Sequence, residues 1–345
     1  MISARSLVMS VVSLVATVVN AGDGVKSFCE DGRGASMHTD SARLARRRYD
    51  PGTLKPPPFD YVPATSVDEA HAALADAGED AQILAGGQSL IPLLSLRLAH
   101  PSTLVDVNGV EELASMESVD GALRIGATVR HRTVERSQEA GASIPLLAEA
   151  MPLIGHVAIR SRGTIGGSLA HADPAAELPA IAVALGATFT VRSRDRGERT
   201  IGAEDFFQGY FTTAIEPDEL LCSIDFPVLP ARSGCSIEEV ARRHGDFALV
   251  GVVAAVTLDE HGTIGDARIA IMNVADRAVR ATAAEQAIVG MAAAGATFGD
   301  AASAAGEALD PPGDLHASPA YRRKVAGVCV RRALERATRR ALEAV

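Results

Sequence analysis

Two glycine pairs, each followed closely by a serine, have the residue types and spacing to hold a ligand. The first lies in the run Ala85-Gly86-Gly87-Gln88-Ser89-Leu90, between an apolar segment over residues 81–85 and a helical pattern. Glycines tolerate positive φ and let a backbone approach a ligand closely. Successive backbone N–H groups in such a turn, with a helix N-terminus behind them, can cradle a pyrophosphate.

The second glycine pair lies in the run Thr164-Ile165-Gly166-Gly167-Ser168 and is followed by Asp173 and Glu177. Its hydroxyls and these carboxylates suit a ribityl chain, a ribose and phosphate oxygens. Neither run is the dinucleotide-binding Gly-x-Gly-x-x-Gly or a P-loop. One such turn alone is equally well explained as a tight strand–helix connection, but two in one chain favour a ligand site.

The elements that must position these loops can be predicted from capping and periodicity. Ser66 with Glu69 three residues later is typical of a capping box that opens a helix, and Gly78 ends that helix. A strand over 122–127 is expected to close the first small α/β unit. Other expected strands cover 81–85, 103–107, 187–191, 199–201, 219–226, 248–258 and 264–272. Other expected helices cover 89–94, 129–138, 144–151, 179–185 and most of 278–345.

Composition excludes several classes of protein. The formal net charge of −10 argues against nucleic acid as the main partner, because phosphate binding needs a concentrated basic face. The four cysteines have neither zinc spacing nor the tight local spacing of an iron–sulfur site, so no metal site is expected in this chain. Reduced cysteines favour a reducing compartment.

The N-terminus allows two interpretations. The apolar run Leu7–Val19 follows Arg5 and ends near Ala21, which is typical of an export signal and too short for a membrane span. The alternative is a start codon assigned too far upstream, with the true start near Met37. Residues 1–54 are therefore expected to be a leader or a mis-assigned start without regular structure. The protein is expected to be cytoplasmic, with export left open and no membrane partner.

The two glycine loops together resemble a known family. The runs Ala-Gly-Gly-x-Ser-Leu and Thr-Ile-Gly-Gly-Ser-x-Ala-x-Ala-Asp-Pro look like the FAD-binding medium subunit of molybdenum hydroxylases. That family includes the carbon monoxide dehydrogenase medium subunit, the matching subunits of nicotine- and caffeine-type dehydrogenases, and the central domain of xanthine dehydrogenase. The opening Lys55–Tyr61 is also similar, and the resemblance covers about residues 56–345.

The resemblance implies an α+β, two-subdomain FAD-binding fold of the vanillyl-alcohol-oxidase type plus a small C-terminal α/β domain. The FAD-binding domain would cover 55–228, with subdomains at about 55–113 and 114–228, and the C-terminal domain would cover 235–345. The resemblance also implies a third loop beside the flavin, containing Arg243 and Asp246. Candidate cofactor-binding residues are Ala85, Gly86, Gly87, Gln88, Ser89, Leu90, Thr128, Thr164, Ile165, Gly166, Gly167, Ser168, Asp173, Glu177, Leu221, Arg243 and Asp246.

The function implied is electron transfer within an oxidoreductase complex. FAD would be bound non-covalently, because Gln88 stands where some covalent flavoproteins of this fold carry histidine. The molybdenum cofactor and [2Fe-2S] clusters would belong to a large molybdopterin subunit and a small iron–sulfur subunit, in a dimer of heterotrimers. A self-contained FAD-dependent oxidase or dehydrogenase is the alternative. The sequence identifies neither the organic substrate, which the partner would determine, nor the final electron acceptor.

Overall fold

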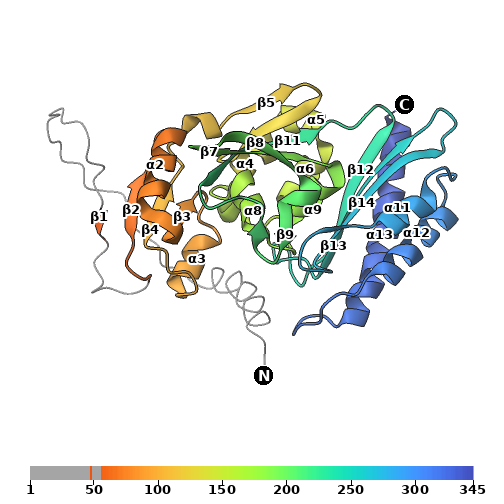
Figure 1. Ribbon diagram of the computed structural model, residues 1–345. Coiled ribbons are helices and arrows are strands. Elements are labelled where there is room, and N and C mark those ends of the chain that lie inside the picture. The colour runs from red at the N-terminus through yellow and green to blue at the C-terminus, as the bar shows by residue number, and fades with distance from the viewer. Residues whose placement is uncertain (1–46, 49–55, 345) are drawn as a thin grey trace.

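A computed structural model describes residues 47–48 and 56–344, which form three larger sheets and one two-stranded sheet, with helices packed against them (Figure 1). Most of the expected leader lies outside the described residues. Within it, β1 (Arg47–Arg48) pairs antiparallel with β2 (Asp60–Pro63). The expectation of an irregular stretch is therefore wrong at these two residues, because an edge strand such as β2 offers unpaired backbone groups to any passing segment.

The first unit is a sheet of strand order β1-β2-β4-β3, in which β2, β4 and β3 run parallel. The carboxyl ends of β3 and β4 therefore meet at one edge, where the first glycine loop begins. The remaining elements of this unit are α2 (Val67–Ala77), η1 (Gly78–Asp80), β3 (Ala81–Leu84), α3 (Leu90–Ser95), β4 (Thr103–Asp106) and η2 (Glu111–Leu113).

Helix α2 begins and ends where its capping residues predict. The Ser66 hydroxyl accepts a hydrogen bond from the Glu69 N–H, and Gly78 ends the helix at φ +70. The Glu69 carboxylate bonds to the N–H and hydroxyl of Thr65 rather than to Ser66. The helix start predicted from the sequence is thus confirmed, with a shifted partner for the glutamate.

The second unit is a five-stranded antiparallel sheet of order β5-β6-β11-β7-β8. Strand β6 (Ala122–Gly126) pairs with β11 (Glu219–Pro227) and not with the first sheet, so its assignment to the first unit is wrong. The other strands of this sheet are β5 (Met116–Val119), β7 (Thr188–Ser193) and β8 (Gly197–Gly202). Strands β9 (Phe207–Gly209) and β10 (Thr212–Thr213) form a separate two-stranded antiparallel sheet. The helices are α4 (His131–Arg136), α5 (Gln138–Ser143), α6 (Pro145–Ala150), η3 (Met151–Leu153), α7 (Val157–Arg160), α8 (Ile165–His171), α9 (Glu177–Leu185) and α10 (Ala203–Phe206).

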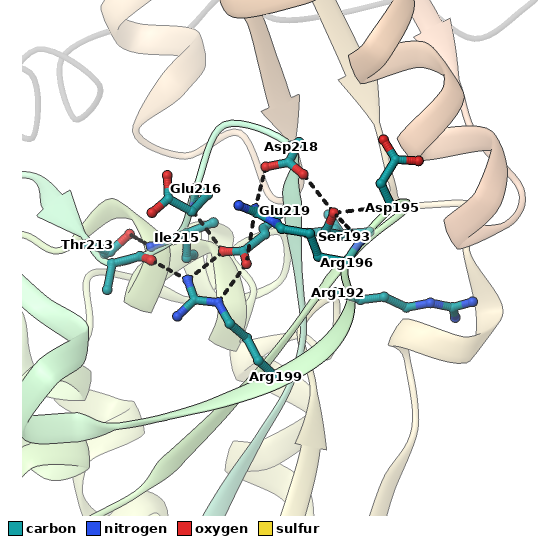
Figure 2. Close-up of polar contacts among 12 residues, drawn as sticks. Arg192, Ser193, Asp195, Arg196, Arg199, Thr213, Ile215, Glu216, Asp218 and Glu219 are labelled. Atoms are coloured by element: carbon teal, nitrogen blue, oxygen red, sulfur yellow. Dashed lines mark hydrogen bonds and ion pairs between the residues drawn. The ribbon is translucent and has the colours of Figure 1, made fainter.

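An ion-pair cluster fixes the β7–β8 hairpin to the start of β11 (Figure 2). The Arg199 guanidinium donates two bonds to the buried Glu219 carboxylate, at 2.6 and 2.7 Å. Glu219 also accepts the Glu216 N–H, and Asp218 accepts from Ser193 at 2.6 Å. Arg199 holds the pKa of Glu219 below its usual range. Because every partner lies in this sheet or in the turn before β11, we interpret the cluster as stabilising the sheet and not as part of a ligand site.

The third unit is an antiparallel sheet of order β12-β13-β14-β15, and Figure 1 shows its helices on the face away from the rest of the molecule. The strands bury both faces. In β13, Val252 and Ala254 pack with the helices, whereas Val253 and Ala255 pack with the second unit. The elements are β12 (Ser233–Val240), β13 (Val250–Leu258), β14 (Ile264–Met272), β15 (Val279–Arg280), α11 (Thr282–Ile288), α12 (Gly295–Ala308) and α13 (Pro319–Glu343).

Most of the elements predicted from local patterns are confirmed, including the helical C-terminal stretch and the strand pair β13–β14. Strands β2, β5, β9, β10, β12 and β15 were not predicted. Over the residues described, no helix is both long and apolar enough to cross a bilayer.

Candidate cofactor site

Loop 1, residues 85–89, connects β3 to α3. Gly87 has a φ of +71, a conformation that favours glycine. The Gln88 side chain folds back, and its Nε2 donates to the Gly86 carbonyl oxygen at 3.1 Å. The Gln88 side chain thus stabilises the turn. The Ser89 side chain makes no capping hydrogen bond to α3.

Loop 2, residues 162–168, leads into α8. Thr164 is the N-cap of that helix, and its hydroxyl accepts the Gly167 N–H at 3.1 Å. A Cβ built on Gly163 would lie 2.9 Å from Nδ1 of His131, and one on Gly166 would lie 2.5 Å from the Ala127 Cβ. Burial lowers the pKa of His131 to about 4, so this ring packs against loop 2 as a neutral group. Glycine is required at both positions by close packing.

Loops 1 and 2 contact each other directly through their backbones. A Cβ on Gly86 would lie 2.5 Å from the Arg162 carbonyl oxygen and 2.8 Å from the Gly163 Cα. A Cβ on Gly167 would lie 3.6 Å from the Ala85 Cβ. The two glycine pairs, about 80 residues apart in sequence, therefore form one continuous backbone surface.

An asparagine and an arginine hold this contact together. Asn108 follows β4, and its Nδ2 donates to the Ala85 carbonyl oxygen of loop 1 at 2.8 Å. Arg130 donates from Nη2 to the Asn108 Oδ1 at 2.6 Å and from Nη1 to the Arg162 carbonyl oxygen of loop 2. Burial and the nearby Arg162 lower the pKa of Arg130. The Asn108–Arg130 pair thus bridges the main chains of both loops.

Loop 3, residues 241–249, connects β12 to β13 and reaches back to the second unit. A Cβ on Gly245, at φ +82, would lie 2.9 Å from the Gly155 carbonyl oxygen. The rings of His244 and His156 stack with centroids 6.2 Å apart. Asp246 pairs with Arg242 at 3.5 Å, and Arg243 is exposed. Loop 3 therefore rests on the segment that precedes α7 and loop 2.

Three carboxyl groups lie behind loop 2, where the second and third units meet. Burial raises the pKa of Asp173 to about 6. Burial, followed by the charge of Glu239, raises the pKa of Glu177 to about 8. Burial also raises the pKa of Glu239, on the β12 face toward the second unit, to about 7. With a pKa of about 8, the Glu177 carboxyl is mostly protonated near neutral pH and can donate a hydrogen bond, whereas Asp173 is mostly ionised there.

The structure brings together most of the residues predicted from the sequence. Loop 1 holds Ala85 to Ser89, with Leu90 starting α3, and loop 2 with α8 holds Thr164 to Ser168. Thr128 follows β6 and is buried, with no hydrogen-bond partner for its hydroxyl among the described residues. Leu221 lies in β11 and packs in the core. The cofactor role of each residue stays a prediction.

Asn108, Arg130 and Asn273 are structurally important here and were not predicted. Asn108 follows a parallel strand at its carboxyl end, the edge where such sheets place ligand sites, and that signal could have identified it. Asn273 follows β14, and its Nδ2 donates to the Ala248 carbonyl oxygen of loop 3 at 2.6 Å. No local pattern marks Arg130 or Asn273, since their partners are distant in sequence.

The fold, with glycine loops at the edge of a small parallel sheet and an antiparallel C-terminal unit, defines a class of cofactor-binding subunit. The chain belongs to the family described as "FAD binding domain in molybdopterin dehydrogenase", whose model matches residues 57–229. A second model, "CO dehydrogenase flavoprotein C-terminal domain", matches residues 236–337. The resemblance inferred from the two glycine runs is thus confirmed.

Relatives match along almost their whole length. The chain is 44% identical to the 6-hydroxypseudooxynicotine dehydrogenase complex subunit alpha of Paenarthrobacter nicotinovorans, over 84% of this chain and 97% of the relative. It is 40% identical to the caffeine dehydrogenase subunit beta of a Pseudomonas species, over 83% and 97%. Among solved structures, carbon monoxide dehydrogenase from Hydrogenophaga pseudoflava matches with a TM-score of 0.80 and 39% identity, over 83% of this chain and 99% of that one.

Relatives of this kind are subunits of oxidoreductases, and the residues present in this chain fit an FAD cofactor. Loops 1 and 2 meet through glycines packed too closely to admit side chains. Gly87, Gly167 and Ser168 beside this contact stay partly accessible, and their backbone N–H groups suit a pyrophosphate. The Thr128 hydroxyl is buried and has no hydrogen-bond partner among the described residues. Within the described residues, no group of three or more His, Cys, Asp or Glu side chains is arranged to hold a metal ion.

Proposed function

We propose that this chain binds one FAD non-covalently along loops 1, 2 and 3 and serves as the electron-transfer subunit of a molybdenum hydroxylase. The observation that carries the proposal is the backbone contact between Gly86 and the Arg162–Gly163 segment, held by Asn108 and Arg130. This contact makes a single cradle of two loops in a chain that matches the FAD-binding family. Bound FAD supplies redox chemistry that no amino-acid side chain provides.

The protein residues then bind and orient the cofactor. Backbone N–H groups of loops 1 and 2 would face the pyrophosphate, and the Thr128, Thr164 and Ser168 hydroxyls would face ribityl or ribose oxygens. Protonated Glu177 would add a hydrogen-bond donor without negative charge, and the Asp173 carboxylate would accept hydrogen bonds from ribityl or ribose hydroxyls. Loop 3, with Arg243 and Asp246, would lie beside the flavin ring. Gln88 is already bonded to Gly86, which supports a non-covalent site.

The partners proposed are a small subunit with [2Fe-2S] clusters and a large molybdopterin subunit that oxidises the organic substrate, in a dimer of heterotrimers. Electrons would reach this chain from the iron–sulfur subunit and leave to an acceptor. Relatives named as subunits of dehydrogenase complexes match along nearly their whole length, which supports this arrangement over a self-contained oxidase. We propose a cytoplasmic location, in keeping with the free cysteines Cys222, Cys235 and Cys329.

The test is to purify the full-length chain, record its visible absorbance, and repeat the measurement after acid precipitation. Flavin absorbance that passes into the supernatant supports a non-covalent FAD subunit. Absorbance retained in the pellet contradicts the non-covalent site and favours the self-contained oxidase. Absence of flavin even after incubation with FAD contradicts the proposal. Copurification with a cysteine-rich and a molybdopterin-binding chain tests the partners.

A further inference from the structure

Loop 3 is anchored from both sides of the boundary between the second and third units. The Leu249 N–H donates to the Val240 carbonyl oxygen at 2.7 Å and closes the base of the loop. The tip rests on Gly155 of the second unit through Gly245. On the inner side, the main-chain carbonyls of Ala248 and Leu249 accept hydrogen bonds from Asn273 and Arg322.

Asn273 bonds to loop 3 and also reaches the segment that follows α8. It follows β14, is 6% exposed, and has a φ of +59, a left-handed conformation that Asn tolerates better than most residues. Its N–H donates to the Pro174 carbonyl oxygen at 2.7 Å. Its side-chain Nδ2 donates to the Ala248 carbonyl oxygen at 2.6 Å. One residue thus bonds to the segment that holds Asp173 and to loop 3.

Arg322 of α13 fixes Asn273 from behind. Its side chain is 1% exposed, and Nη1 donates to the Asn273 carbonyl oxygen at 3.0 Å and to the Leu249 carbonyl oxygen. Its Nη2 donates to Asp314, which keeps the buried charge paired. A continuous set of buried bonds therefore runs from α13 through Asn273 to Pro174 and to loop 3.

These bonds join two segments that the proposed function places around the cofactor. Pro174 directly follows Asp173, and Ala248 lies two residues after Asp246. A clamp needed only for folding of the C-terminal unit would bond within that unit. Asn273 instead donates to a carbonyl of the second unit.

We propose that Asn273 is a positioning residue for the flavin. It sets the distance between loop 3 and the Asp173–Glu177 segment, and so fixes the polarity and solvent access around the flavin ring. The inference rests on the proposed FAD function. Asn273 acts through Asp173 and loop 3, and the left-handed backbone lets its N–H and its side-chain amide reach both segments at once.

The experiment uses the full-length chain and two substitutions. Asn273→Gly keeps the backbone conformation and removes the side-chain donor. Asn273→Asp keeps the shape and places an acceptor against the Ala248 carbonyl. Asp120→Gly is the matched control, because Asp120 also has a positive φ, of 48, but lies in the exposed β5–β6 turn. For each protein we would measure the FAD dissociation constant, iodide quenching of flavin fluorescence, and the flavin reduction potential.

Loss of one buried hydrogen bond predicts an FAD dissociation constant raised roughly 5- to 10-fold in Asn273→Gly. We also expect increased quenching and a shifted reduction potential, with a larger effect in Asn273→Asp and none in Asp120→Gly. If Asn273 has a purely structural role, the variants will change in unfolding temperature but keep the wild-type reduction potential and quenching. That result would overturn this inference and leave the proposed FAD function standing. A wild-type chain that binds no FAD would overturn the proposed function and this inference together.

Discussion

The two junctions between the loops use the same pair of side-chain types in different surroundings. At the junction of loops 1 and 2, Asn108 and Arg130 hold the carbonyls of Ala85 and Arg162. At the junction of loop 3 with the Asp173–Glu177 segment that follows loop 2, Asn273 and Arg322 hold the carbonyls of Ala248 and Leu249, and the Asn273 N–H donates to the Pro174 carbonyl. The first pair lies within the predicted FAD-binding domain, where Asn108 is exposed. The second pair joins that domain to the C-terminal unit and is buried.

Because of this difference in burial, we expect the two junctions to differ in how strongly they affect FAD binding and the stability of the fold. Breaking an exposed hydrogen bond releases groups to water, whereas breaking a buried one leaves an unsatisfied carbonyl in the interior. The first junction should therefore affect the cofactor with little change in stability. The second should affect both, because the same bonds also hold the C-terminal unit in place. The predictions below test that contrast.

The largest effect on the cofactor is expected from Gly86→Ala. The new Cβ would lie 2.5 Å from the Arg162 carbonyl oxygen, and a backbone atom cannot move aside as a flexible side chain would. Overpacking costs about 1–3 kcal/mol, so FAD affinity should fall by up to about 100-fold, measured by fluorescence titration. The control is Gly202→Ala, since a Cβ at Gly202 meets nothing within 4 Å. Equal affinity in both variants would show that the loops need not touch.

The second prediction compares the two asparagines by stability. Asn273→Gly, which keeps the left-handed backbone, leaves the Ala248 carbonyl buried without its partner and should lower the free energy of unfolding by about 2 kcal/mol. Asn108→Ala exposes the Ala85 carbonyl to water and should lower it by less than about 0.5 kcal/mol. Urea unfolding of both variants without added FAD measures this difference. Equal losses would contradict the contrast between the buried and exposed junctions.

The sequence predicted the parts of the site that depend on local chemistry. The glycine pairs, the Ser66 cap and the strand before loop 1 carry their own signals, because turn geometry and capping involve residues a few positions apart. The family resemblance came from the same local runs. That is why the fold and both glycine loops could be identified before any contact was known.

The parts that were not predicted depend on pairing across long separations. Strand β6 joins the second sheet because it pairs with β11, about 100 residues away, and no local feature of 122–126 records this. Strand β12 contains Gly234 and two serines, so the segment resembles a linker, yet one face packs against α13 and the other against the second unit. Asn273 and Arg322 are also separated by 49 residues.

The third prediction concerns pH and the carboxyl groups at the second junction. Glu177 and Glu239 have pKa values raised from 4.5 to about 8 and about 7, so the folded state holds protons that the unfolded state has released. This stabilisation is complete below about pH 4.5 and is lost as pH rises through about 7 to 8. His131, with its lowered pKa, acts in the opposite direction only below about pH 6.5.

The unfolding temperature of the wild-type chain should therefore fall by a few degrees between about pH 6.5 and about pH 8.5. Glu239→Gln removes one ionisable group from the junction and should flatten this dependence, since its amide stays neutral across the range. Glu260→Gln in the exposed β13–β14 turn is the control and should leave the profile unchanged. A profile in Glu239→Gln that still matches the wild type would rule out a role for this carboxyl in the pH response.

The smallest effect is expected from the coupling within the first junction. Arg130→Ala and Asn108→Ala should each weaken FAD binding, and each removes one end of the same 2.6 Å hydrogen bond. The double variant should then lose less affinity than the sum of the single losses, with a coupling energy of about 0.5–1 kcal/mol. Arg130→Lys is the informative control, because lysine keeps the positive charge but cannot bond to Asn108 and to the Arg162 carbonyl with one planar group. If Arg130→Lys binds FAD as well as the wild type, the charge alone matters at this junction. If it resembles Arg130→Ala, the bridge between the loops is what the cofactor needs, as the geometry of the exposed pair predicts.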